Sequence, residues 1–455
     1  MDNIDLALVK KYNVAGPRYT SYPPATRFTS EVAWPTLVEE ILENNTEDGD
    51  LSLYFHIPFC ESLCWYCGCT TVITKDHAQG AVYLDFLEKE LDRMAALLNP
   101  NRKVVQMHLG GGTPTFLKPD ELRRLGDMIR SRFRVASDVE GGVEIDPRRL
   151  TRDHVAALQE AGFNRASLGV QDFDPKVQLA VHRVQSREQT GKAIEWLRSH
   201  RFESINIDLI YGLPYQTTET LAQTLDAVQA YRPDRLAVFS YAHVPWIKPA
   251  QRALEEALPS ADEKFALLKQ VIETLTTGDE YIYIGMDHFA RPDDELAIAQ
   301  RNKTLHRNFQ GYSTRGGVDI YSFGMSAISQ IGRAYWQNTK ELPDYYERLN
   351  GKDFPFVRGY LLTDDDQIRR RIIMRLMCDL SVDFDSMSQE TGIDLHRYFA
   401  EEIRSLDELE ADGLLLRTSS GFEITAMGRL FLRNVAMRFD ACSNRETGRM
   451  FSRTI

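Results

Sequence analysis

The sequence predicts an α/β protein whose core is built from six strand–helix units. Between residues 50 and 245, apolar runs of strand length alternate with amphipathic helical stretches, and a polar or glycine-rich cluster follows every run. Repeated strand–helix units form a parallel sheet, because each helix carries the chain back to the same edge. Parallel folds bind ligands beside the C-terminal ends of their strands, so the six clusters are expected to ring one face.

The apolar runs locate the strands, and the amphipathic stretches between them locate the helices. The apolar stripe of an amphipathic helix is clearest in residues 81–98, where Leu84, Leu87 and Leu91 share one helical face. The pattern fits an open barrel as well as a flat doubly wound sheet, so the curvature stays open at this point. Strands are expected at 51–57, 104–109, 142–145, 165–170, 205–210 and 236–241, and helices at 81–98, 119–133, 155–161, 176–197 (long enough for more than one helix) and 221–231.

The core is expected to span residues 50–280, with further segments on both sides. The N-terminal segment 1–49 contains Gly-Pro-Arg-Tyr-Thr-Ser-Tyr-Pro-Pro at 16–24. This stretch is too polar and too rich in proline for a regular element, so we expect a surface arm or a lid. Residues 281–358 are expected to be substrate-side loops and a connecting segment with a short strand at 281–286, and residues 359–455 a helical domain with helices at 367–380 and 396–409 and a small hairpin at 414–424.

The bulk composition is that of a globular protein, which we expect in the cytoplasm. The 455 residues are 43% hydrophobic and 26% charged, and no apolar run is long enough to span a bilayer. The first ten residues lack the basic-then-apolar pattern of a secretory signal. The net charge of −12 disfavours a nucleic-acid binder. The C-terminal helices and hairpin resemble a winged-helix shape, which would suggest DNA binding. Residues 382–440 hold 12 acidic and 6 basic side chains, however, and a negative surface does not suit phosphate contacts.

Cys60, Cys64 and Cys67 form a C-x3-C-x2-C triplet just after the first predicted strand. Cysteines crowded in this way, in a chain of this size without a sign of secretion, are expected to be reduced metal ligands and not disulfides. Three thiolates can hold three irons of a [4Fe–4S] cluster and leave the fourth iron open. A zinc site is the alternative, but it would need a fourth ligand, commonly from a second C-x2-C pair, and the sequence has none.

The triplet and its surroundings resemble the radical SAM (S-adenosylmethionine) superfamily. Within it, the whole chain is similar to the oxygen-independent coproporphyrinogen III oxidase family, from the N-terminal arm to the C-terminal helices. The resemblance rests on the stretches GPRYTSYP at 16–23, HIPFC at 56–60, CGC at 67–69, GGGTP at 110–114, GVQDF at 169–173, DLIYGLP at 208–214, GMDHFARPDD at 285–294 and HRNFQG at 306–311.

This resemblance implies a partial (β/α)6 parallel barrel of radical SAM type with an N-terminal arm and a mostly helical C-terminal domain. It also implies anaerobic oxidative decarboxylation of two propionates of coproporphyrinogen III to vinyl groups, giving protoporphyrinogen IX in haem biosynthesis. Cys60, Cys64 and Cys67 would hold the [4Fe–4S] cluster, where SAM yields a 5′-deoxyadenosyl radical. Two propionates need two radicals, so two SAM molecules are expected. The implied SAM contacts are Tyr54, Tyr66, Gly111, Gly112, Thr113, Glu144, Gln171, Arg183, Asp208, Ala242 and Ile328.

Cys69 follows the triplet by two residues. We expect that it is not a fourth cluster ligand, because filling the last site would block SAM. Two interpretations stay open. Cys69 is either a packed structural thiol, or a catalytic thiol that handles a proton or an electron near the substrate.

A substrate with four propionates calls for a pocket with several cations, because guanidinium forks pair best with carboxylates. Arg18, Arg291, Arg301 and Arg307 are candidates, and none of them is assigned. The expected partners are coproporphyrinogen III, an unidentified electron donor and a terminal electron acceptor. We expect no nucleic-acid or membrane partner, and we expect a monomer. Two rival functions are a haem-binding chaperone, whose family typically lacks the counterparts of Cys69 and of the 16–23 arm, and a haem-degrading methyltransferase.

Overall fold

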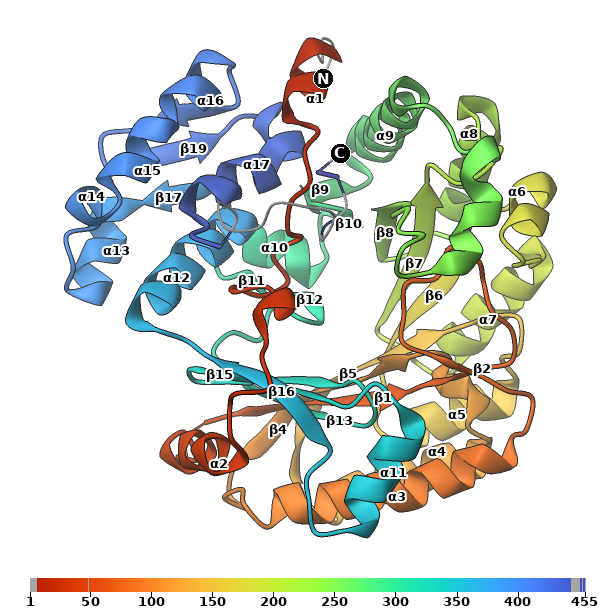
Figure 1. Ribbon diagram of the computed structural model, residues 1–455. Coiled ribbons are helices and arrows are strands. Elements are labelled where there is room, and N and C mark those ends of the chain that lie inside the picture. Colours follow the sequence, from red (N-terminus) through yellow and green to blue (C-terminus); the bar gives the residue numbers. More distant parts are fainter. Residues whose placement is uncertain (1–5, 48, 443–450, 452, 455) are drawn as a thin grey trace.

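The computed structural model describes residues 6–47, 49–442, 451 and 453–454 (Figure 1). Its centre is a sheet of twelve strands among these residues, in which the six predicted strands lie side by side in chain order and run parallel. The α/β prediction and all six strand predictions are therefore confirmed. These strands are β1 (Leu51–Ile57), β4 (Lys103–Gly111), β5 (Arg134–Ile145), β6 (Arg165–Gln171), β7 (Ser204–Tyr211) and β8 (Arg235–Ser240).

Each predicted helix follows its strand and buries its apolar stripe against the sheet. Leu84, Leu87 and Leu91 are fully buried in the main hydrophobic core, as the helical periodicity of 81–98 requires. The stretch 176–197 forms two helices, and Ser186 begins the second by accepting a hydrogen bond from the Gln189 backbone N–H. The helices are α3 (Ala78–Ala95), α4 (Pro119–Arg130), α5 (Arg152–Glu160), α6 (Pro175–Ala180), α7 (Arg187–Ser199) and α8 (Thr218–Ala230).

The sheet is curved, which decides between the two forms that the sequence left open. In Figure 1, β7 and β8 stand steeply at the right, while β1, β4 and β5 run across the lower part of the molecule. A cavity of about 230 Å³ is lined by side chains from strands far apart in the sheet, among them His108 of β4, Asp208 of β7 and Phe239 of β8. Only a sheet that wraps around this space can present all of them to it, so the structure is an open, partial barrel.

The sheet extends beyond the six strands at both ends. β13 (Asp319–Phe323) adds a parallel strand next to β1, and β14 (Ile328–Ile331), β15 (Ala334–Asn338) and β16 (Phe356–Leu361) continue it antiparallel. At the other end, β10 (His288–Ala290) and β9 (Ile282–Gly285) follow β8. The sequence analysis placed a strand at 281–286, where β9 lies, but missed the others. They are short and mix polar with apolar residues, which gives little periodicity.

The N-terminal segment has no helix or strand at residues 16–24, as expected, but this stretch is not a surface arm. The segment contains α1 (Leu6–Tyr12) and α2 (Trp34–Glu43), and most of residues 16–24 are buried. Tyr19 and Tyr22 belong to the hydrophobic core of the C-terminal region, and the Tyr19 hydroxyl donates to Asp440 Oδ2 at 2.9 Å. The expected surface position was wrong because tyrosine buries a large ring once its hydroxyl finds a partner, and the role as a lid stays a prediction.

The C-terminal region is mostly helical with one small sheet, as predicted. The expected hairpin is formed by β18 (Leu415–Arg417) and β19 (Gly421–Ile424), with β17 (Ser381–Asp383) as a third strand. The predicted helix 396–409 is divided into three short helices. No helix among the described residues is long and apolar enough to cross a membrane. The helices of the region are α12 (Asp364–Asp379), α13 (Phe384–Thr391), α14 (Leu395–Tyr398), α15 (Ala400–Ser405), α16 (Asp407–Ala411) and α17 (Leu432–Ala436).

The remaining elements lie, in sequence, between strands of the large sheet. They are β2 (Phe59–Cys60), β3 (Val72–Ile73), α9 (Ala261–Thr276), α10 (Glu295–Arg301), β11 (His306–Asn308), β12 (Gly311–Ser313) and α11 (Leu342–Asn350).

Candidate active site

The cysteines lie on one loop that is fixed at both ends. Cys60 ends β2, which pairs with β3, so the chain leaves and returns at neighbouring positions. The Thr74 N–H donates to the Cys60 carbonyl at 2.9 Å, and within the loop the Cys67 N–H donates to the Cys64 carbonyl at 3.0 Å. We call residues 60–69 the cysteine loop. These contacts hold the loop at the C-terminal end of β1, where the sequence placed it.

Two arginines point at the Cys64 sulfur. The guanidinium nitrogens of Arg183 and Arg148 lie 3.6 and 3.7 Å from Cys64 Sγ. Asp146 joins them through contacts of 3.1 and 2.6 Å. Burial alone would raise the pKa of Asp146, but the two guanidinium groups outweigh it and lower that pKa to about 2. The pair therefore keeps positive charge beside the loop, which stabilises thiolates.

The cysteine loop fits a [4Fe–4S] cluster better than a zinc ion. Among the described residues, no three His, Cys, Asp or Glu side chains are grouped so that they could hold a metal ion. Zinc needs its ligands to converge on one atom, whereas a cluster takes each thiolate on a different iron. Three thiols on one short loop fit the donor set of such a cluster, and the guanidinium groups at Cys64 add positive charge beside it.

The glycine run after β4 has a packing reason of its own. A Cβ on Gly112 would lie 2.7 Å from the backbone carbonyl oxygens of Pro58 and Phe59, so only glycine lets this strand pass the start of the cysteine loop. Gly111 has φ +113° and faces the His56 ring, where a Cβ would lie 2.8 Å away. Thr113 then places its hydroxyl 3.3 Å from Cys60 Sγ. The run therefore lies directly against the first cysteine.

Glu144 connects the glycine run to the cavity of about 230 Å³ that the sheet wraps around, which we call the inner cavity. Its carboxylate accepts a hydrogen bond from the Gly111 N–H at 3.1 Å and lies 3.4 Å from His108 Nε2. Burial would raise the pKa of Glu144, but the His108 contact and the Gly111 N–H lower it overall. Tyr54 stacks on His108 at 5.8 Å between ring centroids, and its hydroxyl lies 3.2 Å from His56 Nδ1. Burial raises the pKa of Tyr54 well above its usual value, so the phenol stays neutral.

Asp208 lies across the same cavity from β4. It accepts hydrogen bonds from Ser167 Oγ at 2.8 Å and from Asn206 Nδ2 at 2.7 Å. Burial, with the nearby Glu144 charge, raises the pKa of Asp208 to about 7. The cavity therefore holds a carboxyl that is ready to change its protonation state when a cation binds.

The other predicted SAM contacts lie on several different elements of the structure. Arg183 donates to the Gly169 carbonyl at 2.6 Å, and its buried Nε has no hydrogen-bond partner among the described residues. Gln171 ends β6 with φ +72°. Tyr66 lies inside the cysteine loop, and its carbonyl accepts a hydrogen bond from Gln251 at 3.3 Å. Ala242 is exposed in the loop after β8, and Ile328 begins β14.

Cys69 is exposed at the end of the cysteine loop. Its N–H points to Cys67 Sγ at 3.4 Å, and its carbonyl accepts a hydrogen bond from Lys248 Nζ at 2.6 Å. The Cys69 thiol lowers the pKa of Cys67 to about 6 by hydrogen bonding, whereas the pKa of Cys69 itself is raised well above its usual value. Cys69 is thus next to a triplet cysteine and open to solvent, which does not fit a packed thiol.

The four candidate arginines do not gather in one pocket. Arg307 is buried and donates to the backbone carbonyl of Tyr19. Arg291 pairs with exposed Asp293, and Arg301 donates to the Pro292 carbonyl. Arg18 and Arg307 each contact an aromatic ring that lines the inner cavity, since their guanidinium groups lie 5.9 Å from the Phe239 ring and 4.6 Å from the Tyr312 ring.

Sequence reasoning missed four polar residues of this centre. His56 was quoted only as part of a motif, although its Nε2 lies 3.0 Å from the Thr70 carbonyl and fixes the end of the cysteine loop. Asp146 and Arg148 come just after the end of the third predicted strand (142–145), so their position was a usable signal. His108 lies inside a predicted strand, where a polar side chain pointing to the barrel interior could have been noticed.

Comparison with known proteins agrees with this geometry along the whole chain. Residues 54–228 match the radical SAM superfamily, and residues 362–431 match the HemN C-terminal domain. The chain is 46% identical to the oxygen-independent coproporphyrinogen III oxidase of Salmonella typhimurium, over 99% of this chain and 98% of that protein. It is 44% identical to the Pseudomonas aeruginosa protein of the same name, with the same coverage.

A solved structure gives the same result for the fold. Coproporphyrinogen III oxidase (HemN) from Escherichia coli, described as a radical SAM enzyme, matches with a TM-score of 0.92 and 44% identity, over 97% of this chain and 99% of that one. The partial barrel, the cysteine loop and the C-terminal helices thus recur together in one related protein. The chain belongs to the oxygen-independent coproporphyrinogen III oxidase family of the radical SAM superfamily.

Proposed function

We propose that this enzyme converts coproporphyrinogen III to protoporphyrinogen IX without oxygen. Relatives that are 44–46% identical are named oxygen-independent coproporphyrinogen III oxidases. Each of two propionates loses a hydrogen atom, CO₂ and one electron, and becomes a vinyl group. The observation that carries the proposal is the cysteine loop. It holds the three thiols of the triplet, and two guanidinium groups face it at the C-terminal ends of parallel strands, in a chain related to these enzymes over its whole length.

The cluster is proposed to be held by Cys60, Cys64 and Cys67. When it is bound, it supplies the electron that cleaves SAM to methionine and a 5′-deoxyadenosyl radical. Arg148 and Arg183 contribute positive charge at Cys64, which offsets the negative charge of the thiolates. His56 and the β2–β3 pairing keep the loop in one conformation, so that the thiols keep their spacing.

SAM is proposed to bind between the cysteine loop and the inner cavity. The unpartnered Arg183 Nε and the carboxyl groups of Glu144 and Asp208 are polar groups of the kind that an amino acid and a ribose would engage. The neutral phenol of Tyr54 supports the Glu144 side of this space through His108. Two SAM molecules are proposed, with Tyr66, Gly111, Gly112, Thr113, Gln171, Ala242 and Ile328 as the further contacts.

Cys69 is proposed to act on the substrate side of the cluster. Because it is exposed and next to Cys67, its thiol can exchange a proton or an electron with a bound molecule. An external one-electron donor and a terminal electron acceptor complete the reaction, since each propionate step takes one electron in and releases one. The enzyme is proposed to work as a monomer, with all the groups named above on one chain.

The test is an anaerobic assay of the iron-reconstituted protein with SAM, dithionite and coproporphyrinogen III. Protoporphyrin, detected by fluorescence after oxidation, and deoxyadenosine are measured together. The proposal expects protoporphyrin with two deoxyadenosines for each molecule. Deoxyadenosine without protoporphyrin would contradict the substrate, and a ring-opened tetrapyrrole would favour the haem-degrading methyltransferase. A cluster-loaded protein that binds haem and forms no deoxyadenosine would be the chaperone.

A further inference from the structure

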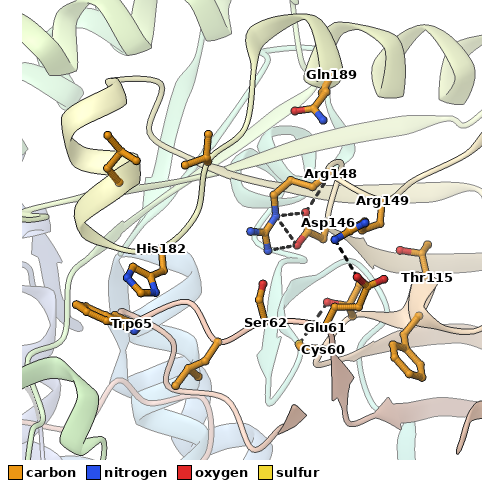
Figure 2. Close-up of a pocket in the computed structure, with 15 residues that line it drawn as sticks. Cys60, Glu61, Ser62, Trp65, Thr115, Asp146, Arg148, Arg149, His182 and Gln189 are labelled. Atoms are coloured by element: carbon orange, nitrogen blue, oxygen red, sulfur yellow. Dashed lines mark hydrogen bonds and ion pairs between the residues drawn. The ribbon is translucent and has the colours of Figure 1, made fainter. Parts of the chain in front are cut away.

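A second cavity lies beside the cysteine loop, and the mechanism above does not use it. Its volume is about 790 Å³, and its walls come from the cysteine loop, the segments that follow β4 and β5, and the stretch from the end of α6 to the start of α7 (Figure 2). It shares no lining residue with the inner cavity that holds Glu144 and Asp208. Cys60 lines it directly. Thr113, one of the proposed SAM contacts, lines it too. The cavity is therefore a second approach to the triplet, distinct from the inner cavity.

Large apolar side chains around this cavity are exposed to water. Leu179 is 65% exposed and Val184 is 62% exposed, and Leu63 of the cysteine loop is exposed as well. All three line the same hollow. Single exposed apolar residues are common, but several around one cavity are typical of a surface that another protein covers.

The charges at this cavity are arranged with the cation outward. The Arg149 side chain is 65% exposed, whereas its ion-pair partner Glu61 is only 21% exposed (Figure 2). Asp146, the other acidic group in the lining, is mostly buried behind Arg148. This face therefore presents a positive side chain to solvent, although the chain as a whole carries a net charge of −12. An approaching surface that is negatively charged would be favoured here.

The same face is connected to the cysteines through short contacts. The exposed His182 ring packs on Trp65 at 3.8 Å between centroids, and Trp65 lies between Cys64 and Cys67 in the sequence. Arg148, in the cavity wall, lies 3.7 Å from Cys64 Sγ. A redox centre placed over the cavity would thus be close to the cysteine loop without entering the inner cavity.

We propose that this face, defined by Leu63, Arg149, Leu179 and Val184, is the docking surface for the electron donor. The partner is a small one-electron carrier protein with a negatively charged surface. The proposal rests on the proposed function, which requires such a donor. In each encounter the carrier is oxidised by one electron and the cluster is reduced by one, and no covalent bond forms or breaks. Redox encounters use small contact areas, which suits a face of this size.

The test compares two electron sources on the reconstituted holoenzyme. Flavodoxin hydroquinone serves as the acidic carrier, dithionite serves as the small reductant, and deoxyadenosine formation is measured with each. Leu179→Glu and Arg149→Glu are expected to lower kcat/KM for the carrier by about tenfold or more, because they place like charges at the contact. The dithionite rate is expected to stay within about twofold of the native rate, since a small reductant needs no docking surface.

Matched controls lie on other faces. Leu416 is 62% exposed on the C-terminal hairpin, and the Arg333 side chain is 53% exposed and pairs with Glu40. Leu416→Glu and Arg333→Glu are expected to leave both rates unchanged. Carrier-driven rates within about twofold of native for both face variants would overturn the proposal. An equal loss of rate with both reductants would also overturn it, because it would mean that these residues keep the cluster in place and do not bind the carrier. Native protein that forms no deoxyadenosine with dithionite would instead refute the radical SAM function.

Discussion

At the scale of single residues, Cys67 and Cys69 lie two positions apart in the sequence but are proposed to have different roles. The triplet cysteines are proposed to hold the cluster, whereas Cys69 is exposed and keeps a contact to Cys67 through its N–H. We predict that Cys69→Ser keeps the iron content and deoxyadenosine formation but lowers protoporphyrin formation by about a hundredfold, the usual effect of losing a general acid or base. Iron analysis and the two product assays check this. A fully active variant would remove the catalytic role.

Glu90 provides a pH test that is independent of catalysis. This buried carboxyl accepts hydrogen bonds from the Gly324 N–H, Asn338 Nδ2 and the Tyr345 hydroxyl at 2.8, 2.7 and 2.7 Å. Burial raises the pKa of Glu90 to about 7, above the value of about 4.3 in an unfolded chain. The folded state therefore binds the proton more tightly. The resulting stability is complete below the unfolded pKa and is lost as the pH rises through the folded pKa.

We predict that the unfolding free energy of the native protein, relative to that of Glu90→Gln, falls by about 2 kcal/mol between about pH 5 and about pH 8. Urea unfolding of both proteins across this range measures the difference. Parallel pH profiles of the two proteins would show that Glu90 does not titrate there.

The residues that sequence reasoning located share one property, a position at a strand end. Gln171 is the last residue of β6, and Glu144 and Asp208 lie near the C-terminal ends of β5 and β7, so their place at one end of the sheet follows from the topology alone. Arg148 reaches Cys64 across 84 positions of the chain. Such a contact depends on how two loops pack and leaves no periodic signal, so the sequence alone could not show it.

At the scale of elements, Gly112 and Gly68 form a matched pair around the cysteine loop. A Cβ on Gly112 would meet two backbone carbonyls at 2.7 Å, and both accept hydrogen bonds that hold β2 and its surroundings. A Cβ on Gly68 would meet nothing within 4 Å. We predict that Gly112→Ala displaces the start of the loop, costs about 2 kcal/mol of stability and lowers the iron and sulfide retained after reconstitution.

Gly68→Ala is the control, and it should retain the native cluster content. Iron and acid-labile sulfide per chain, with urea unfolding of the apoprotein, measure both effects. Equal cluster content in the two variants would show that the close approach at Gly112 does not position the loop.

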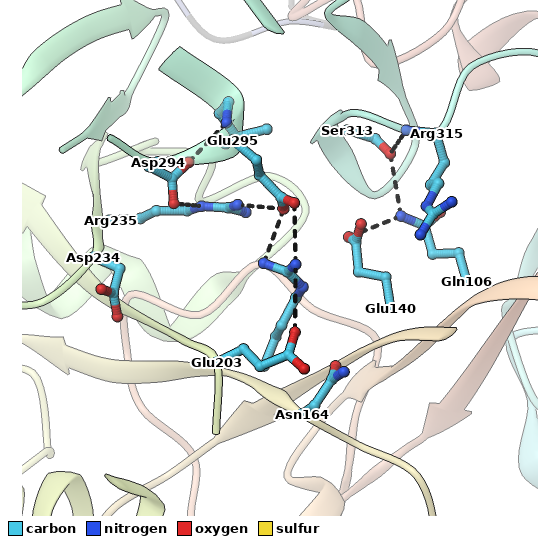
Figure 3. A network of polar contacts seen from close by, with 12 residues as sticks. Gln106, Glu140, Asn164, Glu203, Asp234, Arg235, Asp294, Glu295, Ser313 and Arg315 are labelled. Carbon is cyan, nitrogen blue, oxygen red and sulfur yellow. Dashed lines mark hydrogen bonds and ion pairs between the residues drawn. The ribbon is translucent and has the colours of Figure 1, made fainter. Parts of the chain in front are cut away.

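An ion-pair network ties α10 to the sheet at the opposite end of the strands (Figure 3). Arg235 donates to Asp294 at 2.9 Å and to Glu295 at 2.7 Å, and Arg165 reaches Glu295 at 2.8 Å. Asp294 also begins α10 by accepting a hydrogen bond from the Leu296 N–H. We predict that Asp294→Ala costs about 3 kcal/mol, since it removes a helix cap and one partner of a mostly buried arginine.

Asp293→Ala is the adjacent control, because Asp293 is exposed and pairs only with Arg291 at the surface. Its cost is expected to be about 0.5 kcal/mol or less. Urea unfolding of the two variants gives the comparison. Similar losses at both positions would mean that the network adds no more than a surface ion pair.

At the scale of the whole molecule, the six repeated units were predictable because each carries its own periodicity. The arm and the sheet extensions were not, because they are defined by partners distant in sequence. β13 lies beside β1 although about 260 residues separate them, and Tyr19 donates to Asp440 across 421 positions. The strand pattern alone did not predict the curvature, since a flat and a wrapped sheet use the same strands, whereas the family resemblance implied the partial barrel that the structure has. The inner cavity exists only because the sheet wraps.

The central claim is that a radical formed from SAM takes hydrogen from the propionates of coproporphyrinogen III. The most direct measurement uses substrate deuterated at the propionate carbons next to the ring, with reconstituted enzyme, SAM and dithionite under anaerobic conditions. Mass spectrometry of the deoxyadenosine then reports where its new hydrogen came from. We predict that deuterium appears in deoxyadenosine, with two labelled molecules for each protoporphyrinogen. Vinyl formation accompanied by unlabelled deoxyadenosine would contradict the account.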